Sequence, residues 1–193
     1  MPAFNPLSLL LLMRNLENIY LIGLMGVGKT TIGKQLARAL QWPFYDSDKV
    51  IESSTGTDIP TIFSYEGEEG FRQREQAIIQ ELTGLQGVVM ATGGGAIIKP
   101  ENREALKQTG FVVYLHCSID KILYRTRHDT QRPLLRTDNP RQRLQTLFQQ
   151  REPLYMECAD FKIDSGVIPG KIVVKTILQQ YQAALEHHES FTS

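Results

Sequence analysis

The most constraining feature of this sequence is a glycine-rich stretch at residues 23–30, Gly-Leu-Met-Gly-Val-Gly-Lys-Thr. It fits the pattern G-x-x-x-x-G-K-[ST], in which a strand leads into a loop and the loop opens a helix. The flanks agree with that order, because residues 18–22 are mostly apolar and residues 30–40 place apolar side chains on one helical stripe, at Ile32, Leu36, Ala37 and Leu40. The stretch therefore predicts an α/β fold in which this loop binds phosphate.

Short apolar runs alternate with longer segments of helical period along the rest of the chain. This alternation predicts a three-layer α/β/α arrangement, a parallel sheet with helices on both faces. We expect five strands, at residues 18–22, 43–45, 88–91, 112–115 and 161–163. We expect helices at residues 30–40, around 71–82, and at 101–108, 119–127, 141–150 and 171–185.

The domain organisation is expected to be simple. With 193 residues, 41% of them hydrophobic, the chain can bury one substantial core, so we predict a single domain over residues 18–185. Residues 1–17 are an extension whose apolar run is far shorter than the ~20 residues that cross a bilayer, and it lacks the flanks of a secretory signal. Residues 186–193 form a polar C-terminal tail. Residues 128–140, with prolines and few large apolar side chains, predict a mobile lid.

The composition bears on partners and location. Twenty-one basic residues balance twenty-one acidic ones, so no net field would hold the chain on nucleic acid or on an anionic membrane. Arginines gather between residues 125 and 143, but no aromatic side chains interleave with them to stack on RNA bases. Cys117 and Cys158 have neither metal-ligand nor redox spacing, which suits a reducing cytoplasm. We expect a cytoplasmic monomer without nucleic-acid or membrane partners.

The chemistry of the loop points to ATP with Mg²⁺. Its glycines let backbone N–H groups point at phosphate oxygens, Lys29 supplies a point charge to the outer phosphates, and the Thr30 hydroxyl is placed to ligate Mg²⁺. The predicted nucleotide-binding residues of this loop are Gly26, Val27, Gly28, Lys29, Thr30 and Thr31. A solvated glycine-rich turn is the alternative, and a dinucleotide site would require a third glycine that the stretch lacks.

A pair of carboxylates follows the second predicted strand. Asp46 and Asp48 lie two residues apart, so in an extended chain both side chains face the same way. One can hold Mg²⁺, directly or through water, while the other orients an acceptor hydroxyl and takes its proton. The alternative is that Asp48 caps a helix beginning at residue 49 and that Asp46 is a turn residue.

Two arginines are candidates for binding an anionic acceptor. Arg72 and Glu75 are three residues apart on a predicted helix, a spacing that also suits an ordinary exposed ion pair. Arg151 is expected in the first turn of a new helix, because Pro153 follows it. If both arginines converge near Asp48, their planar forks would bind a carboxylate.

Two further segments can contact ligands. Gly93, Gly94 and Gly95 directly follow an apolar strand, where they permit close approach of a ligand to the backbone, although a flexible turn has the same composition. Arg132 lies within the predicted lid, from which it can reach the transferring phosphate and help to exclude water.

These segments together resemble the shikimate kinase family. The resemblance covers residues 18–181, approximately. The motifs that carry it stand in the family's order and spacing, and they are Gly-Leu-Met-Gly-Val-Gly-Lys-Thr-Thr from Gly23, Asp-Ser-Asp from Asp46, Phe-Arg-Gln-Arg-Glu from Phe71, Ala-Thr-Gly-Gly-Gly-Ala from Ala91, Arg-Pro-Leu-Leu from Arg132 and Arg-Glu-Pro-Leu-Tyr from Arg151. The resemblance implies a nucleoside-monophosphate-kinase-like fold. It also implies phosphorylation of the shikimate 3-hydroxyl by ATP with one Mg²⁺, in the pathway to aromatic amino acids.

The resemblance also assigns roles to single residues. It implies that Asp48 binds the shikimate hydroxyls as the base and that Gly94 adds a backbone contact. It implies that Asp46 holds Mg²⁺ through water. The other implied roles are carboxylate binding by Arg72 and Arg151, phosphate contact by Arg132, and adenine contacts by Arg125 and by the loop that contains Pro169. The extension at residues 1–17 departs from the compact form of the family.

Two other functions remain open from the sequence. A gluconate kinase-like enzyme of the same fold would use Arg72 and Arg151 for a different carboxylate. A non-catalytic ATP-binding regulator would close its lid for a protein partner, although the presence of Asp48, Arg72 and Arg132 argues against it.

Overall fold

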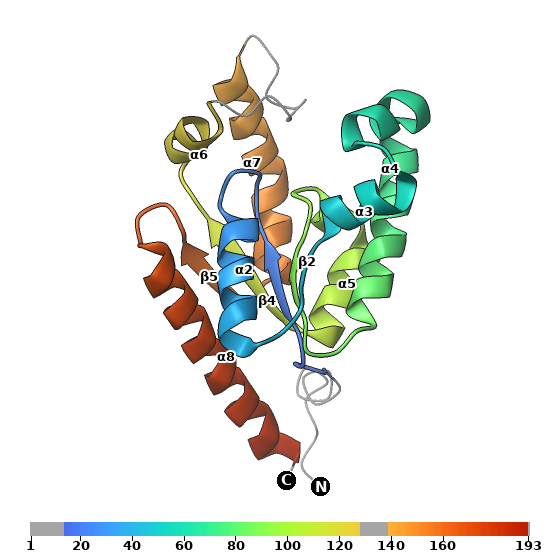
Figure 1. Cartoon of the computed structure of the whole chain (residues 1–193). Coiled ribbons are helices and arrows are strands. Elements are labelled where there is room, and N and C mark those ends of the chain that lie inside the picture. Colours follow the sequence, from blue (N-terminus) through green and yellow to red (C-terminus); the bar gives the residue numbers. More distant parts are fainter. Residues whose placement is uncertain (1–13, 128–138, 193) are drawn as a thin grey trace, which may run out of the picture.

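The structure, a computed structural model, describes residues 14–127 and 139–192 (Figure 1). Its centre is a five-stranded sheet in the order β2-β3-β1-β4-β5, in which every pair of neighbours is parallel. The strands are β1 (Ile19–Ile22), β2 (Phe44–Asp46), β3 (Val89–Ala91), β4 (Phe111–His116) and β5 (Phe161–Asp164). The predicted parallel sheet is confirmed, and each strand begins and ends within one residue of the expected position.

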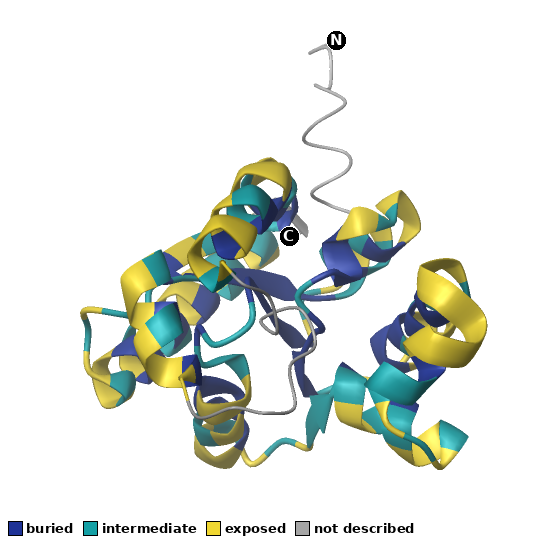
Figure 2. Cartoon of the chain, turned by 90° about the horizontal axis from the view of Figure 1, so that it is seen from above, coloured by how far each residue is buried: buried dark blue, intermediate teal, exposed yellow. Residues whose placement is uncertain are grey.

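Helices cover both faces of this sheet. They are α2 (Lys29–Leu40), α3 (Ser47–Thr55), α4 (Ile59–Thr83), α5 (Pro100–Thr109), α6 (Ile119–Thr126), α7 (Pro140–Cys158) and α8 (Gly170–Thr192), with a 3₁₀ turn η1 at Ala96–Ile98. Helices α2 and α8 pack together on one face, and α5 and α7 pack together on the other (Figure 1). The buried residues gather on the strands and on the inward sides of the helices (Figure 2). This coverage explains why β1 reads as a continuous apolar run.

Helix α7 corrects one prediction. We expected it to end at residue 150 and a new helix to begin at Arg151, but α7 continues through Pro153 to Cys158, so Arg151 lies well inside it. A proline inside a helix costs about 3 kcal/mol. The buried stripe of α7 outweighs that cost, because it packs over the length of the helix at Leu144, Leu147, Arg151, Tyr155 and Cys158.

Both ends of the described chain differ from expectation. Helix α8 runs to Thr192, so its predicted end at residue 185 was wrong. Residues 14–17 were assigned to the extension, but they are bound to the core. Arg14 donates to both carboxylate oxygens of Asp160 at 2.7 Å, and the Tyr181 hydroxyl donates to the Leu16 carbonyl at 2.8 Å. In the described ranges, no helix combines the length and the apolar character that spanning a membrane requires.

Candidate active site

A cleft of about 1240 Å³ opens at the carboxyl ends of the strands. This is the edge at which parallel α/β sheets bind ligands. Most of the predicted site residues line it, namely Gly26, Val27, Gly28, Lys29, Thr30, Thr31, Asp46, Asp48, Arg72, Gly93, Gly94, Gly95, Arg125 and Arg151. Pro169 is not among the lining residues, although its neighbours Ile168 and Gly170 are. Arg132 and most of the predicted lid, residues 128–138, lie outside the described residues.

The loop between β1 and α2 has the geometry of a phosphate cradle. Gly23, Gly26 and Gly28 have φ of 137°, 76° and 103°, a region that strains any residue with a side chain. Within the described chain no side chain caps the N-terminus of α2, and its first turn carries no acidic residue. The first N–H groups of a helix need acceptors, and an anion there also meets the positive end of the helix dipole. The cradle therefore fits the phosphates of a nucleotide.

Lys29 lies folded over this loop. Its ammonium donates to the carbonyl oxygens of Gly23 at 2.7 Å and of Leu24 at 2.9 Å. The positive charge also acts on the acceptor side of the cleft, since it lowers the pKa of Asp48, although burial and neighbouring carboxylates outweigh it. Lys29 thus brings positive charge between the phosphate loop and the side of the cleft that contains Asp48.

The two predicted magnesium ligands meet beside the loop. Thr30 Oγ1 donates to Asp46 Oδ2 at 2.7 Å, so a hydroxyl and a carboxylate oxygen stand together where the cradle ends. Mg²⁺ prefers oxygen ligands, is held by one or two carboxylates, and keeps several waters or phosphate oxygens. The described residues contain no cluster of three or more His, Cys, Asp or Glu side chains that could hold a metal. The oxygens of Thr30 and Asp46 therefore fit Mg²⁺ that arrives with a nucleotide.

Asp48 lies in the first turn of α3, on the acceptor side of the cleft. The capping alternative fails, because α3 begins at Ser47 and its N-cap position is Asp46. Burial raises the pKa of Asp48 to about 6, and the nearby charges of Glu75 and Asp46 add to the shift. A carboxylate with this pKa is ionised at neutral pH and still accepts a proton readily, as a general base must.

Arg72, Glu75 and Arg151 form a buried charged cluster next to Asp48. Arg72 Nη1 donates to Glu75 Oε2 at 2.6 Å, and Glu75 is only 1% exposed. Burial raises the pKa of Glu75, against the opposing charge of Arg72, and burial lowers the pKa of Arg151. The pair is therefore not the exposed ion pair that its spacing allowed. Arg72 Nη2 also donates to the exposed Glu68 at 3.3 Å, so Arg72 and Arg151 are buried guanidinium groups whose donors a ligand carboxylate can meet.

The three glycines after β3 are packed between these groups. A methyl group on Gly93 would come within 2.6 Å of Asp48 Oδ1 and 2.8 Å of Glu75 Oε1, and one on Gly95 would overlap the Arg72 guanidinium. Gly94 lies against the phosphate loop, with Met25 N at 3.4 Å from such a methyl carbon and Arg151 Nη1 at 3.8 Å. Close approach of charged side chains, rather than flexibility, explains this sequence.

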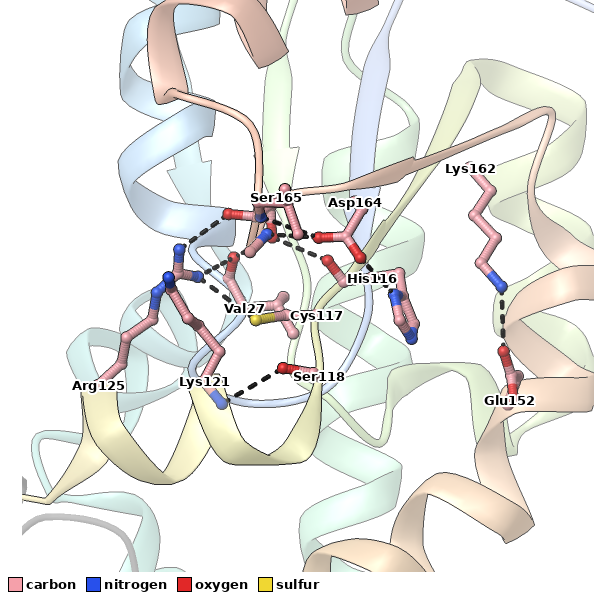
Figure 3. A network of polar contacts seen from close by, with 12 residues as sticks. Val27, His116, Cys117, Ser118, Lys121, Arg125, Glu152, Lys162, Asp164 and Ser165 are labelled. Atoms are coloured by element: carbon pink, nitrogen blue, oxygen red, sulfur yellow. Dashed lines mark hydrogen bonds and ion pairs between the residues drawn. The ribbon is translucent and has the colours of Figure 1, made fainter.

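The opposite end of the cleft is built around Arg125. Figure 3 shows its side chain reaching from α6 to the phosphate loop, where Nη1 donates to the Val27 carbonyl at 3.1 Å and Nη2 donates to the Ser165 carbonyl at 2.8 Å. The Ser165 hydroxyl lies 2.6 Å from the same Val27 oxygen. Asp164 Oδ1 accepts the N–H groups of Gly166 and Val167, which shapes the loop before Pro169.

Sequence reasoning missed some contributors to this arrangement. Ser165 follows the end of β5, and Ser47 follows the end of β2 and accepts the Gly93 N–H at 2.9 Å. Their position directly after strands was the signal that could have singled them out. The Tyr155 hydroxyl donates to the Gly94 carbonyl, a contact that needed the continuous α7.

Comparison with known proteins agrees with this architecture. The family model described as shikimate kinase matches residues 25–182. The chain is 53% identical over 170 residues to a shikimate kinase of Methylococcus capsulatus, covering 88% of this chain and 95% of that one. It is 47% identical to the solved shikimate kinase from Acinetobacter baumannii in complex with shikimate, with a TM-score of 0.84 over 89% of this chain and 96% of that chain.

A more distant structure shows how far the fold extends. A gluconokinase from Sinorhizobium meliloti has a TM-score of 0.57 at 21% identity, over 93% of this chain and 99% of that chain, which is a likeness of fold alone. The family model and the near relatives, by contrast, cover most of this chain at high identity. The chain belongs to the shikimate kinase family, whose members are phosphotransferases with an alcohol group as acceptor.

Proposed function

We propose that this chain transfers the γ-phosphoryl group of ATP to the 3-hydroxyl of shikimate, giving shikimate 3-phosphate and ADP in the pathway to aromatic amino acids. One observation carries the proposal. A single cleft has an uncapped helix N-terminus on one side, and Asp48 with the buried cluster of Arg72, Glu75 and Arg151 on the other. The first side suits polyphosphate, and the second suits a small molecule with both a carboxylate and a hydroxyl.

The nucleotide side binds and orients ATP. The backbone N–H groups of the loop and of Thr30 and Thr31 hold the phosphates, while Lys29 leaves the Gly23 and Leu24 carbonyls to contact the outer ones. Thr30 and Asp46 hold one Mg²⁺, which when bound neutralises charge on the phosphate oxygens. Arg125 and the loop at residues 165–170 hold the adenine.

The acceptor side orients shikimate and removes its proton. Arg72 and Arg151 bind the carboxylate through their guanidinium groups, as buried forks do. Asp48 then accepts a hydrogen bond from the hydroxyl and takes its proton as the phosphoryl group is transferred. Gly93, Gly94 and Gly95 let the ligand approach the backbone closely. Transfer consists mostly of positioning and charge stabilisation, because phosphoryl transfer needs little covalent help from the protein.

Location and assembly belong to the same proposal. Cys117 and Cys158 are both free and buried, as is usual in a reducing cytoplasm. We expect the enzyme to be a monomer. Light scattering on the purified protein tests the assembly.

The test is ADP release in a coupled assay with MgATP and shikimate, with gluconate, or with no acceptor. We expect release with shikimate alone. Release with gluconate alone would show that the chain is a gluconate kinase-like enzyme of the same fold. No release with either compound would favour the non-catalytic ATP-binding regulator. Asp48→Asn is the matched control, since it should keep ATP binding, measured by its thermal shift, and lose transfer.

A further inference from the structure

Helix α4 is kinked, and the kink separates two contributors to the acceptor side. Gly67 has φ 69° and ψ −174°, a conformation that strains any residue with a side chain. Phe63 lies before the kink and lines the cleft. Its ring stacks on that of Phe71 beyond the kink, with centroids 4.6 Å apart, and the Arg72 guanidinium lies 5.2 Å from the Phe71 centroid. The angle of the kink therefore determines where Phe63 lies relative to Phe71 and Arg72.

An ion pair spans this kink. Arg74 donates from Nε to Glu66 Oε2 and from Nη2 to Glu66 Oε1, both at 2.7 Å, although the two residues are eight apart in sequence. On a straight helix, side chains meet at spacings of three or four, and residues eight apart are separated by about 12 Å along the axis. The bidentate contact is therefore specific to the kinked form.

Two features show that the kink depends on more than general packing. A methyl group on Gly70 would come within 2.5 Å of Glu66 Cβ, so the glycine makes room for Glu66 to fold back toward Arg74. On the other side, a hollow of about 280 Å³ lies between α3 and the first part of α4, bounded by Thr55, Thr57 and Tyr65 and by the ion pair itself. Because of that hollow, packing supports the segment before the kink only in part. The angle of the kink at Gly67 therefore depends on the ion pair as well.

We infer that Glu66 and Arg74 are positioning residues for acceptor binding. Their bidentate contact fixes the kink at Gly67 and so holds Phe63 on Phe71, beside the arginine that binds the carboxylate. The inference rests on the proposed function for its kinetic consequence. The pair is 36% and 45% exposed, and exposed ion pairs contribute little to global stability. Its effect should therefore appear in acceptor affinity rather than in unfolding.

The test is Glu66→Gln, which removes the charge and keeps the shape. We expect the KM for shikimate to rise about two- to fivefold, while the KM for ATP, kcat and the urea midpoint stay unchanged. Reversing the pair, with Glu66→Arg and Arg74→Glu together, should bring the KM back toward the wild-type value. In 1 M KCl the difference between wild type and Glu66→Gln should shrink, because salt screens exposed charges.

Glu69→Gln is the matched control. It breaks an ion pair of the same helix, Glu69 with Lys99 at 2.9 Å, which does not bridge the kink. An unchanged KM in Glu66→Gln, or an equal rise in Glu69→Gln, would overturn the inference.

A readout without substrate separates this inference from the proposed function. In Glu66→Gln, hydrogen exchange should speed up in residues 59–66 and stay unchanged in residues 75–83. Faster exchange in an enzyme that ignores shikimate would refute the proposed substrate and keep the positioning role. Unchanged exchange in an enzyme that phosphorylates shikimate would refute the positioning role.

Discussion

Replacing Asp48 by asparagine should make the protein more stable while it abolishes transfer. Burial and the neighbouring carboxylates raise the pKa of Asp48 from 3.8 to about 6. The folded state therefore binds this proton more tightly than the unfolded state, and the stability linked to it is lost as the pH rises from about 4 through 6. A shift of about two units at 1.36 kcal/mol each costs up to about 3 kcal/mol at pH 7.5, a cost that asparagine removes.

Urea unfolding at two pH values measures this effect. At pH 7.5, Asp48→Asn should unfold with a free energy about 1 to 3 kcal/mol above that of the wild type, since water in the open cleft relaxes part of the cost. At pH 4.5 the difference should shrink to about 1 kcal/mol or less, because the wild-type carboxyl is then mostly protonated in the folded state. Equal or lower stability of the variant at pH 7.5 would refute the raised pKa. A difference that does not depend on pH would show that it has another cause.

Three further predictions concern single side chains. Lys29→Ala should lower kcat by about 10²-fold or more in the coupled assay, because neutral amides cannot replace the charge at the outer phosphates, and near-normal turnover would contradict the loop assignment. Arg72→Lys should raise the KM for shikimate about tenfold with little change in the KM for ATP, because an ammonium cannot present a planar fork, and an unchanged KM would remove Arg72 from the acceptor site. Asp160→Ala should lower the free energy of unfolding by about 2 kcal/mol in urea, because the Val112 N–H loses its acceptor and the largely buried Arg14 loses its carboxylate and keeps the Lys107 and Gly110 carbonyls. A loss below about 0.5 kcal/mol would show that the contact is weak.

Much of the fold could be predicted because its signals are local. The apolar runs, the glycine-rich loop and the helical stripe after it each depend on residues close in sequence, so the five strands were placed within one residue. The end of α7 was misplaced because Pro153 is an unfavourable helix residue by itself, and only contacts with the rest of the core show that the helix continues.

The charged cluster was the limit of sequence reasoning at the site. Spacing alone indicated that Arg72 and Glu75 could pair, but not that both are buried beside Asp48 and Arg151, which come from other helices. The kink at Gly67 was equally hidden, because a glycine in a helical segment can also be tolerated without any bend. Both depend on contacts between segments far apart in sequence or on backbone conformation, which local patterns do not specify.

Gly94 has a consequence for attempts to change the acceptor. A methyl carbon added to Gly94 would lie 3.4 Å from Met25 N in the phosphate loop and 3.8 Å from Arg151 Nη1, so this glycine stands between the nucleotide side and the acceptor side of the cleft. A methyl group fits there at contact distance, but a larger side chain, added to reshape the acceptor site, would also press on the loop that holds the nucleotide. Selections for a new acceptor should therefore accumulate substitutions in α3 and in the first part of α4, where the hollow leaves room, and should leave the glycines unchanged.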